Sequence, residues 1–172
     1  AEDLTDFQKL SANTYYQEIE TEDCRRYILC FNPQLFKDQR KARKQAIEDF
    51  KSFTKNLNTQ LNEAKKSRQR KATNNKFTDG IRKYKIAAFV DVSLSLKHIR
   101  NKKKDGTNKN IRTYHGTVKV NEESMLTAGK LDGFWLLVTN HTEKKNGFFE
   151  ILAKEAITPY RDKVVIESAF RD

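Results

Sequence analysis

The sequence predicts an α+β fold with one long basic helix, a β-rich middle that contains an antiparallel hairpin, and a C-terminal helix. Three patterns predict it: an apolar period near 3.6 residues before residue 66, a two-residue period after residue 84, and a helix-start signal near residue 158. The chain has 172 residues, of which 37% are hydrophobic and 33% charged. That is the size of one domain, or of one domain carrying an insertion, with a lean core.

The first segment, residues 1–83, combines an acidic N-terminal stretch, a short strand and a long helix. The apolar run 26–31 is typical of a strand, and Asn32-Pro33 follows it as an N-cap residue and a proline suited to the first helical position. We expect a helix over residues 33–66, with one stripe that packs in the core or against a partner. The stripe consists of Ala46, Phe50, Phe53, Leu57, Leu61 and Ala64.

The second segment, residues 84–140, reads as a β-rich insertion. Residues 84–97 alternate apolar and polar side chains, and a second strand over 111–120 follows a turn at 102–108, which predicts an antiparallel hairpin. A short helix is expected over 122–130. The continuous apolar run 133–139 predicts a strand buried on both faces.

The third segment, residues 141–172, reads as helical. One helix is expected over 147–157 with Phe148 facing inward, and Thr158-Pro159 predicts the start of the last helix. Residues 67–75 are the most linker-like stretch of the chain.

Positive charge follows the middle of the chain. The formal net charge is +11, divided into −6 for residues 1–23, +19 for residues 24–120 and −2 for the remainder. A basic segment of this kind predicts a polyanionic partner, with nucleic acid ahead of an anionic membrane surface, although a merely solvated surface gives the same count. The candidate contacts lie on the hairpin and its tip: Lys102, Lys103, Lys104 and Arg112.

Several other classes of function are disfavoured. The sequence contains no Gly-rich phosphate loop, nucleophile elbow or metal-binding histidine pair, so we expect no small-molecule substrate. No apolar stretch is long enough to span a membrane, so no membrane partner is expected. Cys24 and Cys30 read as reduced core thiols, and His98, His115 and His141 lie far apart without zinc-ligand spacing.

The last predicted helix places one carboxylate beside an aromatic ring and two cations. Tyr160, Lys163, Glu167 and Arg171 fall at i, i+3, i+7 and i+11 and so share a face. A surface ion pair between Lys163 and Glu167 explains the spacing simply. The functional alternative is that Glu167 holds a divalent metal while the tyrosine and the cations hold a phosphodiester.

These residues resemble a known family. Residues 160–172 (YRDKVVIESAFRD) resemble the C-terminal signature of bacterial insertion-sequence transposases of the DDE class, in which a tyrosine, an arginine, a glutamate and a lysine mark the helix with the third catalytic acid. Residues 131–140 (LDGFWLLVTN) resemble the strand that precedes this helix in the family. The resemblance is looser over residues 26–66.

The resemblance implies an RNase H-like catalytic core interrupted by a β-rich insertion, and metal-dependent cleavage and strand transfer of DNA. Glu167 matches the catalytic, metal-binding glutamate, with Mg²⁺ or Mn²⁺ as the ion. Tyr160, Lys163 and Arg171 would contact DNA, and Lys163 stands where the family prefers arginine. The setting it implies is the bacterial cytoplasm, at the nucleoid.

The first two catalytic aspartates of the family are expected upstream of Ala1, and its final lysine beyond Asp172. The chain is therefore expected to be a fragment that is inactive alone and binds no metal tightly. Asp91 and Asp132 could supply a complete triad, but Asp91 falls on the polar face of its strand and Asp132 reads as a turn residue.

Two other functions compete with the transposase. One is a nonenzymatic nucleic-acid-binding module, in which basic residues clamp phosphates and Glu167 only pairs with Lys163. The other is a dimerisation domain, in which Phe50, Phe53 and Leu57 form the surface between two copies of the chain.

Overall fold

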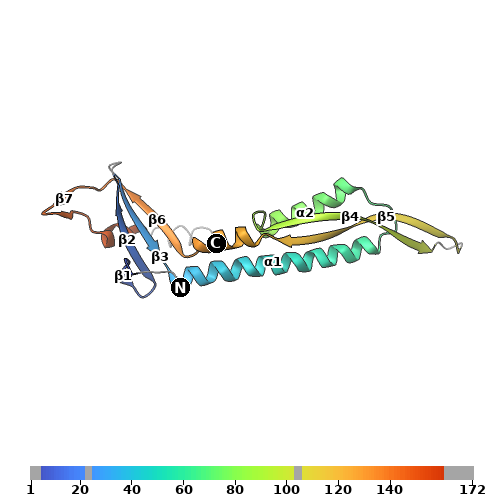
Figure 1. The fold of residues 1–172 in the computed structure, drawn as a ribbon, viewed down its shortest axis with the longest axis horizontal. Coiled ribbons are helices and arrows are strands. Elements are labelled where there is room, and N and C mark those ends of the chain that lie inside the picture. The colour runs from blue at the N-terminus through green and yellow to red at the C-terminus, as the bar shows by residue number, and fades with distance from the viewer. Residues whose placement is uncertain (1–4, 22–24, 103–105, 161–172) are drawn as a thin grey trace. The chain divides into compact units, whose positions relative to one another are not determined.

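The computed structural model describes residues 5–21, 25–102 and 106–160, and it confirms the α+β class (Figure 1). The chain forms two compact units. Unit 1 comprises residues 1–38 and 132–172, and unit 2 comprises residues 39–131. Unit 2 therefore takes most of the long helix from the first expected segment and most of the β-rich second segment.

Unit 1 is built on an antiparallel sheet with the strand order β1-β2-β3-β6. The β1–β2 hairpin was not expected from the sequence, whereas β3 confirms the predicted strand. The strands are β1 (Gln8–Ser11), β2 (Thr14–Glu20), β3 (Arg26–Phe31) and β6 (Phe134–Thr139).

One face of this sheet forms the core of unit 1. Ile28 and Cys30 of β3 are fully buried against Ala153 and Ile157, which lie in a helical segment over residues 153–160. Burial raises the pKa of the Cys30 thiol to about 12, so it remains a neutral, free thiol as expected. Cys24 lies outside the described residues.

The expectation that β6 is buried on both faces is wrong. Leu136 and Val138 alternate with the core residues of β6, and their side chains are 50% and 45% exposed. Among the described strands, β6 pairs only with β3, so it is an edge strand with one covered face. A continuous apolar run does not distinguish this arrangement from a central strand.

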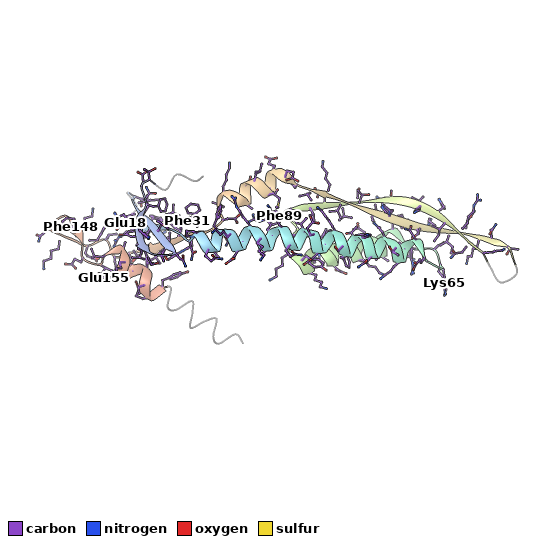
Figure 2. The ribbon with its side chains drawn as sticks, turned by 90° about the horizontal axis from the view of Figure 1, so that it is seen from below. Glu18, Phe31, Lys65, Phe89, Phe148 and Glu155 are labelled. Carbon is purple, nitrogen blue, oxygen red and sulfur yellow. The ribbon has the colours of Figure 1, made fainter. Side chains whose placement is uncertain are left out.

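The expected helix over residues 147–157 is confirmed only for residues 153–157, where Ile157 faces inward as expected, and it is wrong for residues 147–152. Residues 144–149 form a small hairpin of β7 (Lys144–Lys145) and β8 (Phe148–Phe149). Asn146 and Gly147 adopt φ angles of 52° and 83° between the strands, which is the backbone that an Asn-Gly hairpin turn needs. Phe148, expected inward, is 75% exposed (Figure 2).

The last described helix begins earlier than Thr158. Residues 153–160 are helical, and the Glu155 carboxylate accepts a hydrogen bond of 2.9 Å from the Leu152 N–H, which is one half of a capping box. Thr158 and Pro159 therefore lie inside the helix and do not start it. The Thr158 hydroxyl donates to the Lys154 carbonyl at 2.8 Å.

Unit 2 combines helices with a long hairpin, and α1 and α2 run alongside that hairpin (Figure 1). The Asn32 side chain caps α1 as expected, since its Oδ1 accepts from the backbone N–H groups of Gln34 and Leu35 at 2.9 and 3.1 Å. The elements are α1 (Pro33–Asn62), α2 (Arg70–Tyr84), β4 (Val90–Lys102), β5 (Asn108–Val120) and α3 (Glu122–Lys130).

The hairpin and the short helix α3 are confirmed, but α2 replaces two expected features. Residues 70–75 of the expected linker are helical, and the expected strand from Tyr84 begins only at Val90. Phe77, Ile81 and Tyr84 recur at steps of four and three, which is the helical signal. Most other residues of α2 are polar, so this helical period is weak in the sequence.

The apolar stripe of α1 is core and not a partner surface. Phe50, Leu57 and Leu61 are at most 6% exposed and pack within unit 2, so the stripe is closed to a second copy of the chain. Gly116 of β5 permits this packing, because a Cβ there would lie 2.3 Å from the ring of the buried Phe77. The hairpin backbone can therefore approach α1 and α2 closely.

Candidate nucleic-acid interface

Positive charge is concentrated in unit 2. Residues 39–131 carry 24 lysines and arginines against eight aspartates and glutamates, a net charge of +16. The residues of unit 1 carry 10 basic and 15 acidic side chains, a net charge of −5. Net charge therefore favours unit 2 over unit 1 as the place where a polyanion would bind.

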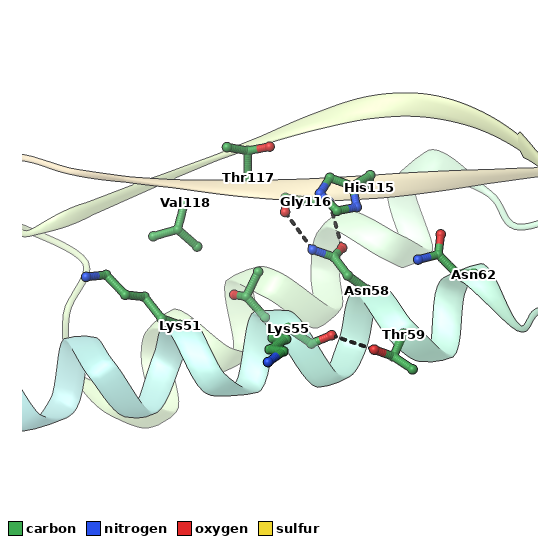
Figure 3. A pocket seen from close by; sticks show the side chains of 10 residues that line it. Lys51, Lys55, Asn58, Thr59, Asn62, His115, Gly116, Thr117 and Val118 are labelled. Atoms are coloured by element: carbon green, nitrogen blue, oxygen red, sulfur yellow. Dashed lines mark hydrogen bonds between the residues drawn. The ribbon is translucent and has the colours of Figure 1, made fainter.

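A groove of about 440 Å³ lies between α1 and β5 of unit 2 (Figure 3). Its lining contains two lysines and several hydrogen-bonding side chains but no carboxylate. Lys51 also pairs with Glu48 at 2.7 Å, on the helix surface beside the groove. The lining residues are Lys51, Thr54, Lys55, Asn58, Thr59, Asn62, His115, Gly116, Thr117 and Val118.

Asn58 fixes the width of this groove. Its side-chain amide donates to the Gly116 carbonyl and its Oδ1 accepts from the Gly116 N–H, both at 2.8 Å (Figure 3). Asn58 is 9% exposed, so both bonds are shielded from water. Nearby, Thr113 Oγ1 donates to the Leu61 carbonyl at 3.0 Å. Helix and strand are therefore joined by side-chain bonds, and the groove is preformed.

The basic surface continues from the groove toward the free end of the hairpin. Lys97 of β4 donates to Asn62 Oδ1 at 2.9 Å, and Lys102 at the end of β4 is exposed. Lys65, in the loop after α1, is also exposed (Figure 2). The side chain of Arg112 is exposed, while its backbone bonds to Arg68 and Ser67 of that loop.

Not every predicted contact can be placed. The expected hairpin is present, but Lys103 and Lys104 at its tip lie outside the described residues. The same holds for Lys163, Glu167 and Arg171 of the signature face. Within the described ranges, no group of three or more His, Cys, Asp and Glu side chains could hold a metal ion.

Tyr160 is the one signature residue that the structure describes. Its ring stacks on Trp135 of β6, with 5.4 Å between the ring centroids and 17° between the planes, and the residue is 46% exposed. The contact joins the two segments on which the transposase resemblance is strongest, residues 131–140 and 160–172.

The aspartates considered for an internal triad behave as turn and surface residues. Asp91 is exposed on the polar face of β4, as its alternation indicates. Asp132 lies in the turn before β6 and is only 3% exposed, a burial that its position in the sequence did not indicate. His98 and His141 are exposed, and His115 lines the groove.

Sequence reasoning missed the groove itself. Thr54 and Asn58 fall beside the apolar stripe of α1 at a helical step of four, so two polar residues next to a core stripe were the available signal. Nothing local indicated that Gly116, 58 residues later, would pair with Asn58.

Three comparisons with known proteins found no match. No protein-family model matches it, and no curated protein or solved structure matches it either. Among the described helices, none is long and apolar enough to cross a membrane.

Proposed function

We propose that the chain is part of a DDE-class DNA transposase with an RNase H-like core, and that unit 2 holds DNA by its phosphates. The observation that carries the DNA-binding part is the division of charge, +16 in unit 2 against −5 in unit 1. Lysines and arginines that replace condensed counterions bind duplex DNA irrespective of its sequence.

The transposase part is supported by the residues of the signature and by their surroundings. The Trp135–Tyr160 stack places the first signature residue, at the end of the last described helix, against β6, and Ile157 one turn earlier is fully buried against β3. In the proposed enzyme, carboxylates that include Glu167 hold Mg²⁺ or Mn²⁺, which supplies the charge stabilisation that phosphodiester cleavage requires.

DNA binding can be tested by fluorescence anisotropy with a labelled duplex at two salt concentrations. We expect the affinity to fall by at least about 100-fold between about 50 and 200 mM salt, which corresponds to about four phosphate contacts. Duplexes of unrelated sequence should bind alike. An affinity independent of salt would contradict the electrostatic argument.

The catalytic part needs a separate test in the whole transposase that contains this chain. Glu167→Gln is nearly isosteric but loses the charge that balances a divalent ion, so we expect metal-dependent DNA cutting to fall by orders of magnitude while DNA binding persists. Cutting at the wild-type rate would leave the nonenzymatic nucleic-acid-binding module as the better description. The encoded sequence around the chain offers a second check, since the family pattern requires a lysine seven positions after Glu167.

A further inference from the structure

Thr54 carries a buried hydroxyl group without a hydrogen-bond partner. The residue is 6% exposed, lines the groove between α1 and β5, and its Oγ1 bonds to no described group. Buried hydroxyls in folded proteins almost always have a partner, because an unpaired one destabilises the fold. A partner that binds in the groove would explain the exception.

Other helical threonines of this chain show the alternative that Thr54 does not take. A helical threonine commonly donates its hydroxyl to the carbonyl four residues earlier. Four threonines make this bond at distances between 2.8 and 3.2 Å: Thr59, Thr73, Thr78 and Thr158. The unpaired hydroxyl of Thr54 is thus a property of its position and not of its residue type.

The chemistry of the groove favours an anion with several acceptor oxygens. The side chains of Lys51 and Lys55 carry positive charge, the covered Thr54 hydroxyl has no partner among the described residues, and no carboxylate lines the groove. Its volume of about 440 Å³ is far more than the roughly 30 Å³ that one water takes in the liquid. An extended anion fits these properties better than an isolated small ion.

We propose that this groove holds a stretch of nucleic-acid sugar–phosphate backbone. Less than 1 Å² of the Thr54 Oγ1 surface is exposed in the free protein. A rotation of the Thr54 side chain therefore brings Oγ1 to a phosphate oxygen, to which it donates directly or through one ordered water, and the ammonium groups of Lys51 and Lys55 neutralise the phosphates. The inference rests on the proposed DNA binding by unit 2 and assigns a site to it. Nucleic acid is favoured over an acidic peptide because the basic surface continues beyond the groove, through Lys65 and Lys97.

The decisive variant is Thr54→Val, which removes the hydroxyl and keeps the shape of the side chain. Because the hydroxyl has no partner among the described residues, the urea midpoint of the variant should equal or exceed that of the wild type. Its affinity for a labelled duplex should fall by roughly tenfold, since one hydrogen bond to a charged acceptor is lost. Higher stability with weaker binding is a combination that a purely structural threonine does not produce.

Thr73→Val is the matched control. Thr73 is equally buried in a helix of unit 2, but its hydroxyl donates to the Gln69 carbonyl at 2.9 Å and it does not line the groove. Its removal should lower the urea midpoint and leave DNA affinity unchanged. Lys55→Ser, a surface change, gives a second measure of the groove, and it should lower the salt slope by about one.

The outcomes separate the two proposals. If the wild type fails to bind duplex DNA, the proposed function fails. If the wild type binds but Thr54→Val and Lys55→Ser bind equally well, DNA lies elsewhere on unit 2 and only the groove assignment is overturned. If polyglutamate of equal charge competes as well as DNA for the wild type and loses affinity equally in Thr54→Val, the groove takes carboxylates and the nucleic-acid assignment is overturned.

Discussion

Arg26 is a charged residue in the interior of unit 1, where it is 1% exposed. Its Nε and Nη2 atoms lie 2.9 and 2.8 Å from the same carboxylate oxygen of Glu18. Nη1 donates to the Ile151 carbonyl, and the guanidinium carbon lies 3.9 Å from the centre of the Phe149 ring. One side chain therefore links β2 and β3 to the segment that leads into the last described helix.

At the residue scale we predict that Arg26→Met destabilises unit 1. The substitution leaves the Glu18 carboxylate and the Ile151 carbonyl without their donor, and removing one partner of a buried ion pair costs about 3 kcal/mol or more. Urea unfolding followed by tryptophan fluorescence measures the change, because Trp135 lies on the adjacent strand.

Arg25→Met is the matched control for this prediction, since Arg25 is the neighbouring arginine and is exposed. Its effect should stay below about 0.5 kcal/mol, as for most surface substitutions. Equal stability of the two variants would mean that the desolvation of Arg26 offsets its contacts.

At the scale of elements, the β4–β5 hairpin combines a rigid base with a charged end. Near its base, Val90 and Val92 pack against α1, and Asn58 and Thr113 bind strand to helix. Toward the tip, both strands carry exposed cations, and the Asn101 side chain still donates to the Ala64 carbonyl at 2.9 Å. The base holds the hairpin in place, and its end is available to a ligand.

We predict that changing Lys102, Lys103 and Lys104 together to serine weakens binding to every duplex and lowers the salt slope by up to about three. Each lost phosphate contact lowers the slope by about one. The urea midpoint should barely move, because Lys102 is exposed at the end of its strand. Fluorescence anisotropy over a salt series measures the slope.

The matched control for the hairpin changes two exposed lysines of unit 1, Lys145 and Lys154, to serine. We expect an unchanged slope for this pair. A slope that stays at the wild-type value in the hairpin variant as well would show that the tip is only a solvated turn.

At the scale of the whole molecule, the two units differ in charge and in the length of their elements. Unit 1 carries a net −5 on a sheet of short strands. Unit 2 carries a net +16 on most of a 30-residue helix and on two strands of 13 residues. Long elements spread the positive charge along a surface, which suits a linear polyanion.

Lysine acetylation in the presence of duplex DNA should therefore protect one unit selectively. We predict that Lys55 and Lys102 of unit 2 become less reactive when DNA is bound, whereas Lys145 and Lys154 of unit 1 react as in the free protein. The protein is digested with a protease that does not cut at lysine, and mass spectrometry of the peptides measures the extent of acetylation at each lysine. Equal protection of the lysines in both units would contradict the proposal that DNA binds to unit 2.

Local signals predicted many of the elements. Asn32-Pro33 marked the start of α1, and the alternation from Val90 to Lys97 marked β4. Such signals succeed because caps and side-chain periods depend on residues only a few positions apart. The Asn146-Gly147 turn is an equally local signal, and it explains why the expected helix over residues 147–157 is absent from its first part, residues 147–152.

The candidate interface was predicted in part. Its charge followed from the sequence, because lysines and arginines are charged wherever the chain places them, and so did the position of Lys102 at the hairpin tip. The groove did not follow, since its two walls are α1 and β5, and their closest bonds join Asn58 to Gly116. No helical or strand period relates residues so far apart.

The sequence by itself determined the long capped helix, the hairpin and the division of charge, because each depends on residue type or on near neighbours. Only the tertiary structure decided which faces are covered: it closed the apolar stripe of α1 inside unit 2, left Leu136 of β6 half exposed, and buried Arg26. It also left the Thr54 hydroxyl without a partner in the part of the chain that the structure describes. Burial and hydrogen-bond pairing depend on chain segments that meet in space, and a periodic pattern cannot say which segments those are.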